Sequence, residues 1–219
     1  MISLEKKFLF IHLPKTAGNS IQNILKIYSE DEITSNKKNQ DGKDRFGIKN
    51  AKYDIEKHST LTDYKKILEK DVYDSLFKFS TIRNPWARMI SYYFSPHRGN
   101  VKWNKREFIN LVNQAPTLGE YIKEYPLSGR ILNRIGFSSD HSSKKLDADV
   151  DYLIRFENLN DDFKNLCKIL DIPFTPLPKT NVSKRKHFSK YYDRDLVKIV
   201  QKKFREEIEF ENYEFDYIS

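Results

Sequence analysis

The stretch FLFIHLPKTAGNSI at residues 8–21 constrains the fold more than any other part of the sequence. Residues 8–13 are apolar except for one histidine, which is typical of an interior β-strand. Residues 20–27 then repeat apolar side chains at helical spacing. We therefore expect a strand, a tight loop and a helix in direct succession.

The loop between this strand and helix has the features of an anion-binding site. A helix N-terminus carries N–H groups without backbone partners and the positive end of the helix dipole. Gly18 is expected to let the backbone approach a ligand closely, while Lys15 adds charge and the hydroxyls of Thr16 and Ser20 add donors.

A second strand-to-helix junction follows at RNP. Residues 76–82 (LFKFSTI) have strand character, Asn84 is a suitable N-cap, and Pro85 suits the first helical position. Arg83 therefore lies between the end of this strand and the N-cap of the helix.

The remaining segments alternate in the same way. Residues 29–53 are polar and predict a surface loop, and a short helix after them has Thr62 as its expected N-cap. The other expected elements are amphipathic helices within 102–136, a strand at 150–156, a helix at 159–170 and a C-terminal helix at 193–209.

This alternation predicts an α/β fold with a mainly parallel central sheet flanked by helices. A length of 219 residues fits one domain, 1–219. Ligands of such sheets bind outside the carboxyl ends of the strands, so we expect Lys15, Arg83 and the Arg155 region at one edge.

Composition limits the function classes. Lys and Arg exceed Asp and Glu by 39 to 31, and this net charge of +8 favours an anionic ligand, an acidic polymer, nucleic acid or a membrane surface without choosing among them. The one cysteine, Cys167, is expected in the core. No segment has the pattern of a leader or a membrane span, which predicts a soluble, cytoplasmic protein.

The first loop departs from the nucleoside-triphosphate P-loop. That motif, G-x-x-x-x-G-K-[ST], needs Lys after the second glycine, whereas Lys15 precedes Gly18. The sequence therefore disfavours a kinase that uses Mg-ATP.

Several motifs together resemble the sulfotransferases that use 3′-phosphoadenosine 5′-phosphosulfate (PAPS). The similarity is to the carbohydrate sulfotransferases, which include the heparan 2-O and chondroitin 4-O enzymes and bacterial relatives. It rests on FIHLPKTAGNS at 10–20, KHS before the second strand, FKFSTIRNPWARMISYYF at 77–94 and RFENL at 155–159. The resemblance implies a P-loop-like sulfotransferase fold and transfer of a sulfuryl group from PAPS to a hydroxyl, most simply on a saccharide or glycan acceptor, without a metal.

The same resemblance implies donor-binding residues. The PKTAGNS loop is similar to the one that holds the 5′-phosphosulfate, although Asn19 stands where Thr is commoner. Arg83 and Ser91 match the site for the 3′-phosphate that remains on the product, adenosine 3′,5′-bisphosphate. The expected donor-binding residues are Lys15, Thr16, Ala17, Gly18, Asn19, Ser20, Arg83 and Ser91, with Lys184 and Arg185 in a late basic loop.

The chemistry requires a base and charge stabilisation. Lys15 is expected to stabilise the leaving phosphate, and His58 to accept the proton of the acceptor hydroxyl, because imidazole titrates near neutral pH. Glu157 is a rival base, although we expect it to hold Arg155. His12 is expected to be a hydrogen-bonded scaffold residue under the loop.

Two other function classes stay open from the residues alone. A protein that binds nucleic acid or another polyanion would use the net charge of +8 and the basic and aromatic stretches, although no nucleic-acid-binding motif is recognisable. A nucleotide kinase would need Mg-ATP despite the altered loop. The acceptor is expected to be selected by residues 29–53 and 96–145.

Overall fold

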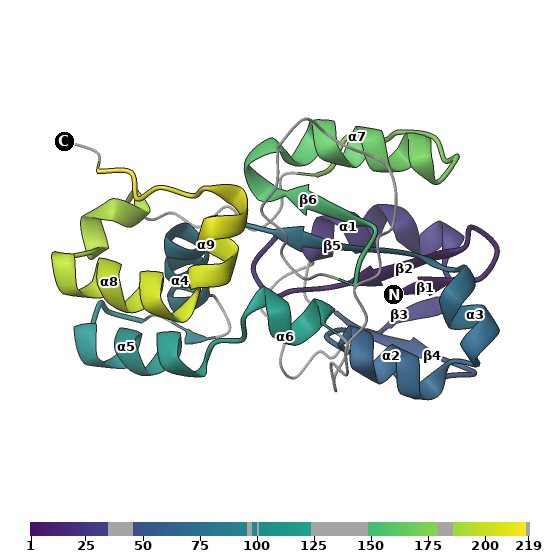
Figure 1. Cartoon of the computed structure of the whole chain (residues 1–219), viewed down its shortest axis with the longest axis horizontal. Helices are drawn as coiled ribbons and strands as arrows, with labels where there is room; N and C mark the ends of the chain where they lie inside the picture. Colours follow the sequence, from purple (N-terminus) through teal and green to yellow (C-terminus); the bar gives the residue numbers. More distant parts are fainter. Residues whose placement is uncertain (35–45, 96–97, 100, 124–148, 179–185, 218–219) are drawn as a thin grey trace.

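The computed structural model describes residues 1–34, 46–95, 98–99, 101–123, 149–178 and 186–217. Within these residues a four-stranded sheet has the order β1-β2-β5-β6, in which β2, β5 and β6 are parallel and β1 is antiparallel to β2. The strands are β1 (Ile2–Ser3), β2 (Phe8–Ile11), β5 (Phe77–Ile82) and β6 (Tyr152–Arg155). The predicted α/β fold with a mainly parallel central sheet is confirmed (Figure 1).

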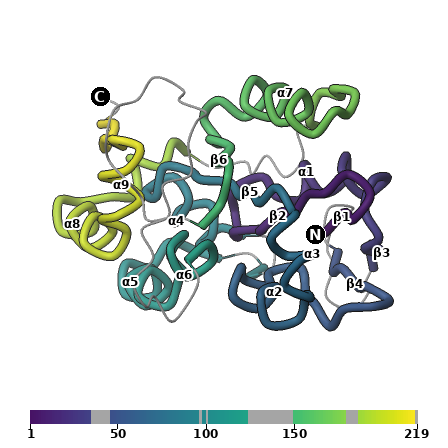
Figure 2. Tube along the Cα trace, turned by 45° about the vertical axis from the view of Figure 1, so that its right-hand side comes forward, coloured from purple at the N-terminus to yellow at the C-terminus, as the bar shows by residue number. Residues whose placement is uncertain are grey.

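Both faces of the sheet are covered by other elements. Successive side chains of a strand point to opposite faces, so β2 contributes to both cores. Phe8 and Phe10 pack against α1 (Gly18–Leu25) and α7 (Leu159–Ile169), where Cys167 is buried as predicted. Leu9 and Ile11 pack on the opposite face. That face is covered by β3 (Asp31–Thr34), β4 (Gly47–Asn50), α2 (Leu61–Ile67), α3 (Lys70–Ser75) and α6 (Leu118–Ile122). Figures 1 and 2 both show α7 and α2 on opposite sides of the sheet.

A separate helical cluster lies beyond the carboxyl ends of the strands, at the left of Figure 1. Its centre is the fully buried pair of Arg88 and Glu207, in which Arg88 Nη2 lies 3.3 Å from Glu207 Oε1. The same Glu207 oxygen accepts from Leu118 N at 2.7 Å and so joins α6 to the cluster. The cluster consists of α4 (Pro85–Tyr93), α5 (Lys105–Gln114), α8 (Arg194–Lys203) and α9 (Arg205–Glu211), with the 3-10 turn η4 (Phe188–Tyr191).

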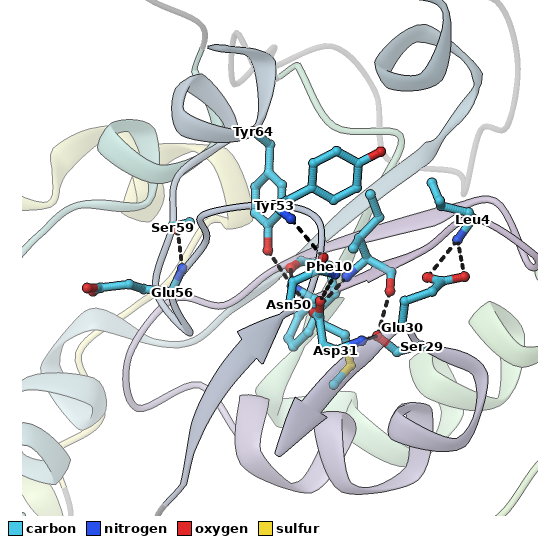
Figure 3. A network of polar contacts seen from close by, with 12 residues as sticks. Leu4, Phe10, Ser29, Glu30, Asp31, Asn50, Tyr53, Glu56, Ser59 and Tyr64 are labelled. Atoms are coloured by element: carbon cyan, nitrogen blue, oxygen red, sulfur yellow. Dashed lines mark hydrogen bonds and ion pairs between the residues drawn. The ribbon is translucent and has the colours of Figure 1, made fainter. Parts of the chain in front are cut away.

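A buried polar network holds β1, the β3–β4 hairpin and α2 together (Figure 3). Asp31 Oδ2 accepts from Ile2 N at 3.0 Å, and Asp31 Oδ1 accepts from Asn50 Nδ2 at 2.7 Å. The Met1 ammonium donates to Phe10 O at 2.9 Å and to Tyr64 Oη at 2.7 Å. Because Tyr64 belongs to α2, this network ties the first residue of the chain to that helix.

The structure corrects three local predictions. Residues 29–53 do not form a plain surface loop, because β3 and β4 pair as a hairpin within them. The N-cap of α2 is Thr60, whose side chain forms a capping box with Asp63, and Thr62 lies inside the helix. The predicted C-terminal helix is two helices, α8 and α9, separated at Phe204.

Candidate active site

The loop after β2 has an unusual backbone for its residue types. Lys15 and Ala17 both have φ of 70°, in the left-handed region that costs non-glycine residues free energy. Such strained positions cluster at functional sites. Ala17 is the N-cap of α1 and supplies no side-chain hydrogen bond, and the first turn of α1 has no acidic residue. The arrangement at this helix N-terminus therefore suits an external anion.

Gly18 packs closely on a buried side chain, and its predicted contact with a ligand stays a prediction. A Cβ atom at this position would lie 2.0 Å from His12 Cδ2 and 2.1 Å from His12 Nε2. The His12 ring is 4% exposed, so it lies directly under the loop. Burial lowers the pKa of His12 well below its ordinary value, and electrostatic repulsion from the neighbouring His58 and Lys57 lowers it further. The close packing of Gly18 on the His12 ring thus leaves no room for a side chain at this position.

The predicted position of His12 under the loop is confirmed. The contact that joins His12 to the site comes from its backbone, since its carbonyl oxygen lies 2.9 Å from His58 Nδ1.

The two hydroxyls of the loop contact the protein. Thr16 is fully buried, and its Oγ1 donates to Leu13 O at 2.6 Å and also contacts Thr81 Oγ1. Ser20 Oγ donates to Pro178 O at 3.1 Å. Both hydroxyls therefore tie the loop to the body of the protein, and their predicted contacts with an anion stay a prediction.

Lys15 and Arg83 meet at the carboxyl edge of the sheet, as predicted. Arg83 Nη1 donates to Lys15 O at 3.0 Å, and Lys15 Nζ donates to Ser95 Oγ at 3.4 Å. Ser91 is half-buried near the end of α4, and Ser95 is a buried residue that follows the C-cap of that helix. The sequence reasoning did not identify Ser95, and no local pattern marks it.

His58 lies beside the loop through a backbone contact. A carbonyl oxygen only accepts hydrogen bonds, so His58 Nδ1 is the protonated nitrogen in its contact with His12 O. In the neutral ring the lone pair is then on Nε2. The His58 residue is exposed, and its ring centroid is 4.6 Å from that of His12. The N-cap of α2 is Thr60, so His58 does not cap that helix.

Lys57 is a neighbour that sequence reasoning missed. Its Nζ donates to Phe46 O at 2.7 Å and lies 4.0 Å from the centroid of the Phe46 ring. Burial, followed by the positive charge of Lys15, lowers the pKa of Lys57 to about 8. Its position next to His58 in the KHS motif was the available signal. The site therefore combines two lysines and two histidines near one loop.

Glu157 does not hold Arg155, which corrects the sequence prediction. Arg155 instead makes a bidentate pair with Asp162, with Nε to Oδ2 and Nη2 to Oδ1 both at 2.8 Å. Glu157 follows β6 and contacts the start of α4, where its Oε1 accepts from Asn84 N at 2.8 Å. The predicted N-cap role of Asn84 is confirmed, since its side chain accepts from Ala87 N at 3.2 Å.

Some predicted features lie outside the described residues. Lys184 and Arg185 are outside, as is half of the segment at 96–145 that we expected to select the acceptor. Across the described ranges, no three His, Cys, Asp or Glu side chains gather as a group that could hold a metal ion. No helix in the part of the chain that the structure describes is long and apolar enough to cross a membrane.

Comparison with known proteins gives one match. A protein-family model described as the sulfotransferase family matches residues 1–126, which is more than half of the 219 residues. This range includes the loop after β2, His58, Arg83 and Ser91, and it ends before β6. Comparisons with curated proteins and with solved structures found no match.

Proposed function

The chain belongs to the sulfotransferase family, and from this premise we propose that it transfers a sulfuryl group from PAPS to a hydroxyl of a saccharide or glycan-type acceptor. The transfer is a direct in-line displacement at sulfur. The acceptor oxygen forms the new bond to sulfur while the bond from sulfur to the phosphate oxygen breaks. The products are a sulfate ester and adenosine 3′,5′-bisphosphate.

One observation carries the proposal, namely the contact between the two strand-to-helix junctions. Arg83 Nη1 donates to Lys15 O at 3.0 Å, so the residue that follows β5 touches the loop that follows β2. The same loop leads into a helix N-terminus without a side-chain cap. Two cationic side chains and a helix N-terminus therefore lie within one site, which suits a ligand with separate anionic groups.

The residues of the chain divide between the two ends of the donor. The backbone N–H groups of the segment from Lys15 to Ser20, together with the Lys15 ammonium, would bind the phosphosulfate end. Arg83 offers a planar fork of donors, and Ser91 a hydroxyl, for the 3′-phosphate. Lys15 would also stabilise the negative charge that develops on the leaving phosphate oxygen.

His58 is the proposed base. Its Nδ1–H donates to His12 O, which orients the ring and leaves the lone pair on Nε2 to accept the proton of the attacking hydroxyl. The exposure of His58 supports this role, because an acceptor needs access to the ring. Glu157 is disfavoured as the base, since its carboxylate accepts hydrogen bonds from Asn84 N and Tyr213 Oη.

The experiment that tests the proposal is calorimetric titration with adenosine 3′,5′-bisphosphate, with 5′-AMP, ADP and Mg-ATP as comparisons at one salt concentration. We expect the bisphosphate to bind most tightly. Arg83→Ala should weaken binding of the bisphosphate much more than binding of 5′-AMP, and Arg194→Ala, an exposed arginine of α8, should change neither. Tighter binding of Mg-ATP would favour a kinase, and strongly salt-dependent binding of long polyanions alone would favour a polyanion-binding protein.

A further inference from the structure

The turn after β6 lies against the first residues of the second junction. In the parallel pairing of β5 with β6, Ile82 is opposite Arg155. The residues that follow, Arg83 and Phe156, therefore leave the sheet side by side. β6 is followed by the 3-10 turn η3 (Phe156–Asn158), so these side chains come from a compact turn rather than from a long loop. Figure 1 shows β6 beside β5 in this part of the sheet.

The Phe156 ring forms a flat support for Arg83. The guanidinium carbon of Arg83 lies 3.7 Å from the centroid of the Phe156 ring, a distance typical of a stacked cation–π contact. Stacking restricts the plane of the guanidinium group, and the plane decides which way its paired donors point. With Nη1 bonded to Lys15 O at 3.0 Å, two separate contacts limit the orientation of this side chain.

The next residue, Glu157, fixes the backbone that carries Arg83. Glu157 Oε1 accepts from Asn84 N at 2.8 Å, and Glu157 Oε2 accepts from Tyr213 Oη at 3.0 Å. Asn84 Nδ2 donates to Glu214 O at 3.2 Å. The segment after α9 therefore contacts both the turn and the start of α4. Burial and the Glu157 carboxylate raise the pKa of Tyr213, so its hydroxyl keeps its proton and remains a donor.

We propose that Phe156 and the Glu157–Tyr213 pair are positioning residues that orient Arg83 for a terminal 3′-phosphate and so set the preference for a 3′-phosphorylated nucleotide. This inference rests on the proposed function, because it assigns the 3′-phosphate to Arg83. It gives a function to the RFENL motif, which lies outside the residues matched by the family model. Neither Phe156 nor Tyr213 needs to touch the ligand.

The test measures nucleotide selectivity, which a merely structural residue would not change. The quantity is the ratio of the dissociation constant of 5′-AMP to that of adenosine 3′,5′-bisphosphate, measured by calorimetry on the full chain. Phe156→Leu should lower this ratio by roughly five- to twentyfold, with binding of 5′-AMP unchanged. Phe156→Tyr keeps the ring and should retain the ratio. The matched control is Phe174→Leu, a partly exposed phenylalanine that contacts Phe163.

A second variant tests the Glu157–Tyr213 pair without changing any charge. Tyr213→Phe removes only the hydroxyl that donates to Glu157, and we expect the ratio to fall by roughly two- to fivefold. Its control is Tyr217→Phe, since Tyr217 is 70% exposed. This variant also decides the outcome if Phe156→Leu does not fold.

The outcomes separate this inference from the function on which it rests. A ratio near one in the unmodified protein would overturn both, because no 3′-phosphate site would exist. A high ratio that Phe156→Leu and Tyr213→Phe leave unchanged would overturn only the positioning role. Equal weakening of both nucleotides in the two variants would also overturn it, since that result indicates general loss of structure.

Discussion

Gly18 offers the sharpest stability prediction, because its neighbourhood can be compared with that of a second helical glycine. In Gly18→Ala the new Cβ would lie 2.0 Å from a carbon of the buried His12 ring, far inside van der Waals contact. In Gly119→Ala the nearest atom would be Glu206 Oε2 at 3.5 Å, an ordinary contact. The two substitutions are chemically identical, so their difference isolates the close packing under the loop.

The magnitudes follow from two opposing effects. Replacing glycine by alanine in a helix stabilises by up to about 1 kcal/mol, and overpacking a filled site costs about 1–3 kcal/mol. Gly18→Ala should therefore destabilise by about 1–2 kcal/mol, and Gly119→Ala should stabilise by about 0.5–1 kcal/mol. For a chain of this size the melting temperature should fall by about 2–8 °C in the first and rise by about 1–4 °C in the second.

Thermal and urea unfolding of the two variants would check this expectation. The double variant with His12→Ala removes the ring and should recover about 1 kcal/mol or more of the loss caused by Gly18→Ala, measured as a coupling free energy. If Gly18→Ala were as stable as Gly119→Ala, or if removal of the His12 ring recovered nothing, the clash would not be the reason for glycine at this position.

Three further predictions concern the site and the turn beside it. Lys15→Ala should lower turnover by roughly 100- to 1000-fold, because leaving-group stabilisation is lost; unchanged turnover in a steady-state sulfuryl-transfer assay would reject that role. His58→Ala should lower turnover by at least about 100-fold while leaving calorimetric bisphosphate binding nearly intact, and a loss confined to binding would argue against a base. Asp162→Asn should destabilise by about 1–3 kcal/mol near neutral pH, because it breaks the pair with Arg155. Burial raises the pKa of Asp162, but its hydrogen bonds with Arg155 and Asn158 outweigh burial and hold the pKa below its ordinary value. Its contribution is therefore present above the unfolded pKa and lost as the pH falls through the folded pKa, so urea unfolding at about pH 3 should show a smaller difference between Asp162→Asn and the unmodified chain than at about pH 7. A difference that is independent of pH would contradict this origin.

The sequence predicted the elements whose signals are local. The apolar run of β2 and the cap-and-proline pair at Asn84 and Pro85 each lie within a few neighbouring residues, and both are confirmed. The β3–β4 hairpin was missed because its two key polar side chains, Asp31 and Asn50, resemble loop residues until their buried partners are known. The break between α8 and α9 has no glycine or proline, and it falls at Phe204, which contacts Arg88.

The candidate site divides in the same way. Lys15 and Arg83 follow strands whose order along the chain makes them parallel, so the sequence by itself determined that they share one sheet edge. Only the tertiary structure decided the partners of each side chain. Arg155 pairs with Asp162 rather than with Glu157, which is nearer in the sequence. The Phe156 ring stacks on Arg83 because β5 and β6 pair with Ile82 opposite Arg155. Periodicity and capping depend on spacing within one segment, whereas a side-chain partner depends on how distant segments pack.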